Sequence, residues 1–227
     1  MSRRKQSRGK CGFCGREMTK GGLSRHLSSC SQRQEATRTA NQEPGKEQVI
    51  YHLLVRDAWL SDFWLHLEMN GSATLADLDH YLRAIWLECC GHLSRFSIGG
   101  WGGREIPKRS RAEQVFRPGV ELTHIYDFGT SSETFIKVVG VREGKPLTSH
   151  PIALMARNDQ PKARCMECEQ PASWMCLECI NELNETGMLC DEHVQDHPHE
   201  AYGTPMPWVN SPRVGMCGYC GPAEPPY

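Results

Sequence analysis

The sequence predicts an α+β fold, with a mixed sheet and one main helix in a central domain and a small Cys/His-rich module on either side. Three observations support this prediction. Segments with the alternation of β-strands surround one helical segment, without the regular strand–helix order of a doubly wound sheet. Cys and His cluster towards both ends of the chain. No apolar run approaches the ~20 residues that a membrane-spanning helix needs.

The central domain is predicted over residues 49–142. The expected strands are 49–56, 62–69, 93–98, 122–128 and 133–141, with a Gly- and Arg-rich loop over 99–119. A helix is predicted over 74–90, because Leu75, Leu78, Leu82, Ile85 and Trp86 follow the spacing of one buried helical face. Thr74 is the expected N-cap, with Asp77 three residues later, and Gly91 is expected to end the helix.

The remaining segments are polar or rich in proline. Residues 1–10 form a basic arm, residues 31–48 and 143–161 are expected to be linkers, and residues 201–227 are a Pro-rich tail with a Cys pair. Residues 1–38 contain ten Lys/Arg and two Asp/Glu, a net charge of +8, whereas the whole chain carries −1. This asymmetry favours a polyanionic partner for the arm, and the alternative is a solvated tail that aids solubility.

The first Cys/His module covers residues 11–30, with the pattern Cys11-x2-Cys14-x11-His26-x3-Cys30. A Cys pair on a turn followed by His26 and Cys30 on one helical face is typical of a ββα zinc finger, which this segment resembles. About twenty residues bury too little apolar surface to fold alone, whereas zinc binding contributes ~10–16 kcal/mol in such peptides. We therefore predict one zinc ion here, and an unfolded module without it.

The finger is not expected to recognise a base sequence. The positions that contact bases in a DNA-reading finger correspond to Thr19, Gly22 and Arg25, and Gly22 has no side chain. Phosphate binding remains plausible, and the alternative is a protein-binding finger. The candidate nucleic-acid-binding residues are Arg3, Arg4, Lys5, Arg8, Lys10, Arg16, Lys20 and Arg25.

The second Cys/His module covers residues 162–200, with the pattern Cys165-x2-Cys168-x7-Cys176-x2-Cys179-x10-Cys190-x2-His193-x3-His197-x-His199. This run resembles a B-box-like zinc module. It offers eight ligands, enough for two tetrahedral ions. In a cross-brace the first and third ligand pairs bind one ion, and the second and fourth pairs bind the other. This predicts Cys165, Cys168, Cys190 and His193 at one site and Cys176, Cys179, His197 and His199 at the other. The alternative is a set of redox-active Cys-x-x-Cys pairs.

Four further cysteines lie outside these sets. Three roles are open to Cys217 and Cys220: replacing His197 and His199 as ligands, binding an extra ion between chains, or remaining free. Cys89 and Cys90 fall on the predicted helix and are expected to be buried, inert thiols.

The central domain resembles the plasmid pRiA4b ORF-3-like family. The resemblance rests on Thr74-Leu75-Ala76-Asp77-Leu78, on His92-Leu93-x-x-Phe96 and, above all, on Tyr126-Asp127-Phe128-Gly129, with Tyr51-x-Leu53 and Phe63-Trp64 in addition. It implies an α+β domain from a plasmid or mobile-element context. Polar residues common in the family are replaced here by Thr130, Ser132, Thr134 and Asp79, while His92 and Asp127 are kept.

No enzyme signature is present: there is no phosphate-binding loop, no His-Glu-x-x-His and no Gly-x-Ser-x-Gly. The leading hypothesis is a cytoplasmic, non-enzymatic adaptor with three zinc ions per chain. Its arm and finger would bind nucleic acid and its C-terminal module a protein, with no membrane contact. The alternatives are a purely protein-binding zinc scaffold, or an unrecognised enzyme acting near His92 and Asp127. The sequence does not indicate the oligomeric state.

Overall fold

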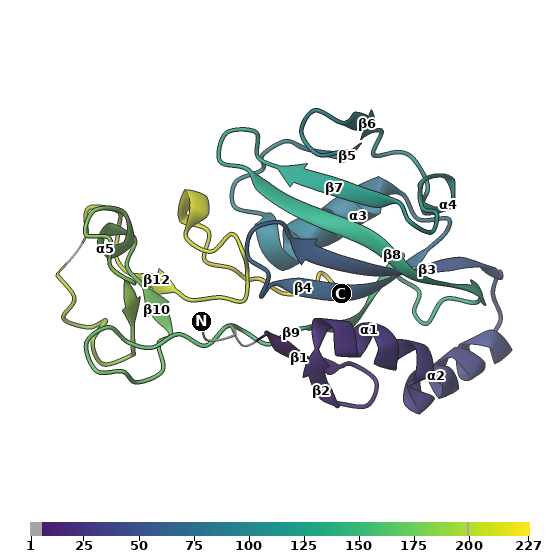
Figure 1. The fold of residues 1–227 in the computed structure, drawn as a ribbon, viewed down its shortest axis with the longest axis horizontal. Helices are drawn as coiled ribbons and strands as arrows, with labels where there is room; N and C mark the ends of the chain where they lie inside the picture. Colours follow the sequence, from purple (N-terminus) through teal and green to yellow (C-terminus); the bar gives the residue numbers. More distant parts are fainter. Residues whose placement is uncertain (1–5, 199) are drawn as a thin grey trace.

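The computed structural model describes residues 6–198 and 200–227, which are built around a nine-stranded sheet (Figure 1). In spatial order the strands are β2 (Glu17–Thr19), β1 (Arg8–Cys11), β9 (Ile152–Asn158), β4 (Trp64–Asn70), β3 (Gln48–Asp57), β8 (Ser132–Gly144), β7 (Glu121–Tyr126), β5 (Ser94–Ile98) and β6 (Arg104–Ile106). The α+β class is confirmed. The expected mixed sheet is wrong, because every pairing among the described strands of this sheet is antiparallel.

One face of the sheet packs on helix α3 (Leu75–Leu82) and the π-helical turn η1 (Arg83–Leu87) that continues it (Figure 1). The helix begins at the expected residue. Thr74 Oγ1 accepts a hydrogen bond from the Asp77 backbone, and the Asp77 carboxylate accepts one from the Thr74 backbone. Leu53 and Leu65 are among the strand residues that meet this helix in the core. The helical segment ends at Leu87, three residues before the predicted end.

The N-terminal module covers the opposite face of the sheet at β4 and β9. Its helix α1 (Lys20–Ser29) places Leu23 and Leu27 against Trp64 and Met155. On β4, Leu65, Leu67 and Met69 face α3 as the alternation predicts, and Trp64, His66 and Glu68 are buried as well. The finger is therefore part of the central fold, and both faces of β4 are buried.

Both expected linkers contain regular structure. Residues 31–48 include helix α2 (Ser31–Gln42), which follows α1 directly. Residues 143–161 include β9, which pairs with β1 on one side and β4 on the other and so joins the finger to the sheet. Gly9 permits this junction, because a Cβ there would lie 2.0 Å from the Arg157 carbonyl oxygen. The linker prediction is therefore wrong for α2 and β9. β9 is a strand because it pairs with β1 and β4, which are distant in the sequence.

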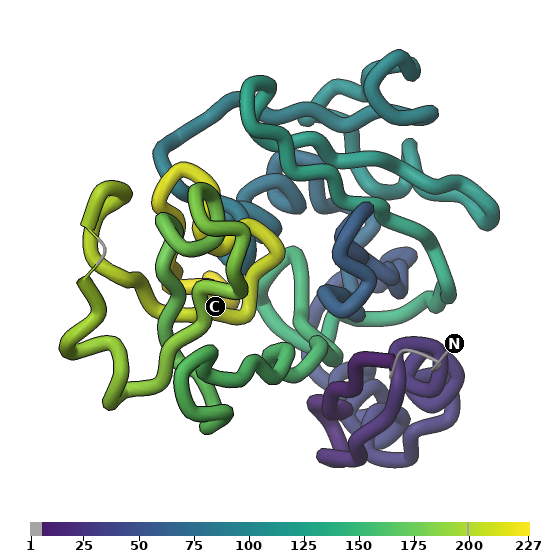
Figure 2. Tube along the Cα trace, turned by 60° about the vertical axis from the view of Figure 1, so that its left-hand side comes forward, coloured from purple at the N-terminus to yellow at the C-terminus, as the bar shows by residue number. Residues whose placement is uncertain are grey.

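The loop expected over 99–119 also contains short elements, β6 and helix α4 (Ala112–Val115). The C-terminal module has its own three-stranded sheet and one helix, and Figure 2 shows it as a lobe separate from the finger. Its elements are β10 (Trp174–Met175), α5 (Leu177–Asn181), β11 (Met188–Leu189) and β12 (Met206–Pro207).

The Pro-rich tail returns from this module and packs on the central domain (Figures 1 and 2). Ser211 Oγ donates a hydrogen bond of 2.5 Å to the Trp86 carbonyl oxygen, at the end of the helical segment. Arg157 of β9 donates to the carbonyl oxygens of Asn210 and Ala223. The tail thus connects the C-terminal module to the sheet. None of the helices in the described parts of the chain has the length and apolar character needed to cross a membrane.

Candidate metal centres

The N-terminal module brings its four predicted ligands together. β1 ends at Cys11, the turn that follows carries Cys14, and α1 presents His26 one turn before Cys30. The four ligand atoms lie within 4.8 Å of one another, with 4.0 Å between the sulfurs of Cys11 and Cys30 and 3.2 Å from Cys14 Sγ to His26 Nε2. Zinc bond lengths imply edges of about 3.8 Å between two sulfurs and about 3.5 Å between sulfur and nitrogen in a tetrahedral site. The set therefore has the size of one tetrahedral metal site.

The first C-terminal group contains Cys165, Cys168, Cys190 and His193, the first and third pairs of the predicted cross-brace. Their ligand atoms also lie within 4.8 Å of one another. The sulfurs of Cys168 and Cys190 are 3.8 Å apart, and His193 Nδ1 lies 3.2 Å from Cys190 Sγ. The His193 backbone N–H lowers the pKa of the Cys190 thiol, which favours the thiolate that a metal ion binds.

The second C-terminal group contains Cys176, Cys179 and His197. Cys179 Sγ lies 3.4 Å from His197 Nε2. The fourth predicted ligand, His199, lies outside the described residues. Cys/His groups near both ends of the chain are thus positioned to hold metal ions of the zinc type, and none of the three groups is an acidic surface cluster.

The remaining cysteines lie elsewhere than the sequence suggests. Cys89 and Cys90 follow the helical segment instead of lying on it, and Cys90 is exposed. Cys217 lies beside His92 and Asp127 of the central domain, away from His197. Cys220 is exposed and joins none of the Cys, His and carboxylate groups found in the described residues.

Comparison with known proteins gives no family for this chain. No family model matches it. No curated protein matches it either. A solved structure with a similar arrangement is a protein of unknown function, MM3350 from Methanosarcina mazei Go1, with 18% identity and a TM-score of 0.40 over 46% of this chain and 67% of that one.

The candidate nucleic-acid-binding residues differ in how available their charges are. Lys10, Arg16 and Arg25 are exposed. Arg8 donates to the Glu17 carboxylate at 2.5 Å, and burial lowers the pKa of Lys20. Arg3, Arg4 and Lys5 lie outside the described residues. Thr19 is the N-cap of α1, and its Oγ1 accepts a hydrogen bond from the Gly22 backbone N–H. This hydroxyl oxygen is therefore engaged in a contact inside the finger.

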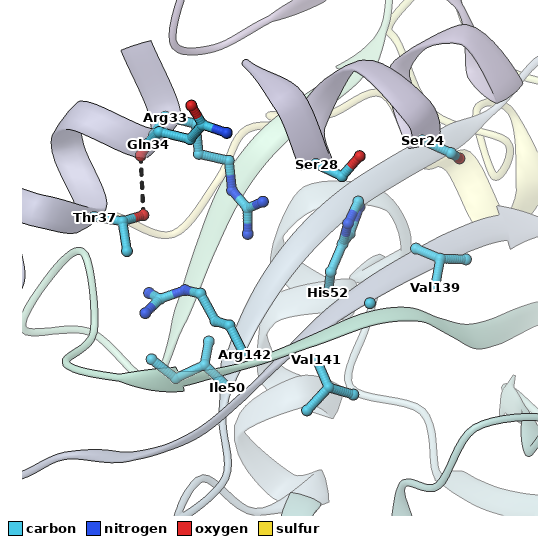
Figure 3. Close-up of a pocket in the computed structure, with 11 residues that line it drawn as sticks. Ser24, Ser28, Arg33, Gln34, Thr37, Ile50, His52, Val139, Val141 and Arg142 are labelled. Carbon is cyan, nitrogen blue, oxygen red and sulfur yellow. Dashed lines mark hydrogen bonds between the residues drawn. The ribbon is translucent and has the colours of Figure 1, made fainter. Parts of the chain in front are cut away.

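A cavity of about 350 Å³ lies between the finger helices and the sheet (Figure 3). Arg33 of α2 and Arg142 of β8 extend into it from opposite sides, and both bind the buried Glu68, at 3.0 Å and 2.5 Å. Ser24 and Ser28 also line it, but each hydroxyl donates to a backbone carbonyl of its own helix. The cavity therefore contains paired cations and hydroxyl groups engaged with the backbone, without the arrangement of an activated nucleophile.

Two histidines lie buried next to this cavity as a hydrogen-bonded pair. His52 Nε2 and His66 Nδ1 are 2.9 Å apart, and His66 Nε2 donates to the Lys20 carbonyl oxygen of α1. His66 Nδ1 is therefore the acceptor and His52 the donor. Burial lowers the pKa of His52 to about 3 and that of His66 to about 4, so both rings are neutral. The pair connects the sheet to the finger helix.

A second buried network lies on the α3 face. Asp79 accepts hydrogen bonds from His124 Nε2 at 2.7 Å, Ser94 Oγ at 2.6 Å and Lys108 Nζ at 2.9 Å. Burial raises the pKa of Asp79, but these donors lower it by more, and the carboxyl group is ionised. His124 is fully buried, and burial lowers the pKa of its imidazole. The network anchors α3 to β5 and β7.

Proposed function

We propose that this protein is a non-enzymatic zinc-binding adaptor of the plasmid or mobile-element type that its resemblance implies. In this proposal zinc binds the three Cys/His groups and stabilises the two modules that contain them. The basic arm and finger bind nucleic acid, and the C-terminal module binds a protein partner. The observation that supports it is the grouping of the predicted ligands into three separate sets, two with four ligands and one with three among the described residues.

The composition of these sets favours structural over catalytic metal ions. The finger and the first C-terminal group each supply three Cys and one His, which fill all four positions of a tetrahedral ion. A catalytic zinc site keeps one position open for water or substrate. With four protein ligands the ion stabilises the fold and leaves the surrounding surface available for binding.

The metal content of the C-terminal module tests the first part of this proposal. We expect Cys168→Ser and Cys179→Ser each to lose one zinc ion per chain relative to the wild type, because each removes a ligand from a different group. Elemental analysis of protein purified without added metal gives the number of zinc ions per chain. A wild-type chain without zinc, or cysteines of these groups linked as disulfides in mass spectra, would contradict the proposal.

Nucleic-acid binding is tested by removing three exposed basic residues of the arm and finger, Lys10, Arg16 and Arg25. We expect K10Q/R16Q/R25Q to weaken binding to a DNA or RNA duplex and to make its salt dependence shallower. The slope of log K against log salt should fall by about 2–3, since each lost phosphate contact removes about 0.9 on B-DNA. Fluorescence anisotropy between low and physiological salt measures this slope.

The matched control is R104Q/R109Q/K137Q, which removes the same charge from exposed residues of the central domain. An equal loss of binding in both variants would indicate a general charge effect. Absence of wild-type binding at low salt would exclude the nucleic-acid part of the proposal and favour a protein-binding scaffold.

One surface feature favours this second candidate function. Trp101 and Phe128 are exposed and pack edge to face, and the Arg95 guanidinium lies 5.1 Å from the Trp101 ring centre. Exposed Trp with Arg is the composition that dominates protein-binding surfaces. The scaffold would then use the far edge of the sheet, near β5 and β7, in addition to the C-terminal module.

A further inference from the structure

The C-terminal tail brings a cysteine to a cluster of ligand-type side chains on the central domain. His92 and Asp127 flank β5 and β7, and Cys217 arrives from the tail. Their ligand atoms lie within 4.8 Å of one another, and His92 also lies within this distance of Cys89 and Cys90. We propose that this cluster is a further transition-metal site of the zinc type, held by Cys90, His92, Asp127 and Cys217.

The measured separations have the size of a tetrahedral site. His92 Nε2 is 3.4 Å from Asp127 Oδ2, and Cys217 Sγ is 3.7 Å from the same oxygen. Zinc bond lengths imply edges of about 3.3 Å between nitrogen and oxygen and about 3.5 Å between sulfur and oxygen. Three ligands from three separate segments thus already lie around one position.

Cys90 is the side chain that completes the set. Its sulfur is 2.9 Å from His92 Nε2, and the residue is exposed, so the thiol can turn about its Cα–Cβ bond towards the ion. Its neighbour Cys89 has less freedom to turn, because it is half-buried and its sulfur lies 3.8 Å from the hydroxyl of the buried Tyr126. Cys89 therefore belongs to the surroundings of the ion.

The Asp127 carboxylate is oriented for this role. Its residue adopts a left-handed backbone conformation, with φ of 63°, at the end of β7. Oδ1 accepts hydrogen bonds from the backbone N–H groups of Gly129 and Thr130, which directs Oδ2 towards His92 and Cys217. Metal-binding carboxylates are commonly fixed by such outer hydrogen bonds.

Arg213 balances the charge of the proposed site. Two thiolates and one carboxylate around a divalent ion carry a net charge of −1, which is costly next to the protein interior. The Arg213 side chain is fully buried and its Nη2 lies 2.7 Å from Asp127 Oδ2 and 3.5 Å from Cys217 Sγ. The guanidinium thus neutralises the set from the inner side, and the ion would fix the tail to the central domain.

Zinc analysis of full-length variants tests this site. We expect Cys217→Ser and His92→Gln each to hold one zinc ion fewer per chain than the wild type. Cys220→Ser should keep the wild-type content, because Cys220 is an exposed residue of the same tail and lies outside the cluster. Substitution of cobalt(II) gives a second readout, since the thiolate-to-cobalt absorption should decrease in Cys217→Ser and not in Cys220→Ser.

Two results would overturn the proposal. One is equal zinc content in folded wild-type, Cys217→Ser and His92→Gln proteins, with folding checked by circular dichroism. The other is a disulfide between Cys217 and Cys89 or Cys90 in protein purified under reducing conditions. Because His92 and Cys217 lie outside the three Cys/His groups of the two modules, either result leaves the proposed function standing.

Discussion

Replacing Cys11 by serine is expected to destabilise the edge of the central sheet together with the finger. Cys11 is a predicted zinc ligand and also the last residue of β1, which pairs with β9. Zinc contributes ~10–16 kcal/mol to the folding of isolated fingers, as much as the whole stability of a typical domain. We therefore expect a large drop in the unfolding temperature. Amide hydrogen exchange should show lost protection in β9 and β4 as well as in the finger.

The physical reason lies beneath α1. Leu23 and Leu27 cover Trp64 of β4 and Met155 of β9, and all four side chains are fully buried. When the finger loses its metal ion, this apolar cluster becomes exposed to water, and burial of one such side chain is worth about 1.5–3 kcal/mol. The loss of stability should thus extend from the metal site into β4 and β9 of the sheet.

Cys168→Ser is the matched control, since it removes one zinc ligand from the separate C-terminal module. It should reduce protection in β10 and β11 and leave β4 and β9 unchanged. If Cys11→Ser loses zinc while β4 and β9 keep their full protection, the finger is energetically independent of the sheet and this interpretation is wrong.

Much of the central domain could be predicted because its signals are local. Thr74 and Asp77 identify the start of α3 within five residues of sequence, and the alternation of β4 is visible in one short run. The Cys-x-x-Cys pairs are equally local, since two thiolates on one turn suffice to suggest a metal site. These features can be predicted without knowing which distant segments they contact.

The features that were missed depend on distant contacts. The sequence of β9 predicts a linker, because its strand structure depends on pairing with β1 and β4, which lie about 145 and 90 residues earlier in the chain. Likewise His66 and Glu68 looked like the solvent side of an alternating strand, and only the finger packed over them makes them buried. The sequence indicates His92 and Asp127 but does not indicate Cys217 beside them, because the fold of the tail brings this residue there.

Replacing Glu68 by glutamine is expected to cost about 3–5 kcal/mol of unfolding free energy, the range for breaking a buried ion pair by removal of one partner. The buried carboxylate binds Arg33 of α2 and Arg142 of β8, and the neutral amide would leave both guanidinium groups without their counter-charge. Because Arg33 also donates to the Leu27 carbonyl oxygen, this network connects both finger helices to the sheet.

Urea denaturation of Glu68→Gln and Glu17→Gln provides the comparison, since each removes one carboxylate charge bound by arginine. Glu17 and its partner Arg8 are both about half exposed, so the second substitution should cost less than about 1 kcal/mol. The contrast isolates burial as the cause, because the chemistry of the two changes is the same. Equal costs for the two variants would mean that solvent reaches Glu68 and that the finger helices are not fixed to the sheet by this carboxylate.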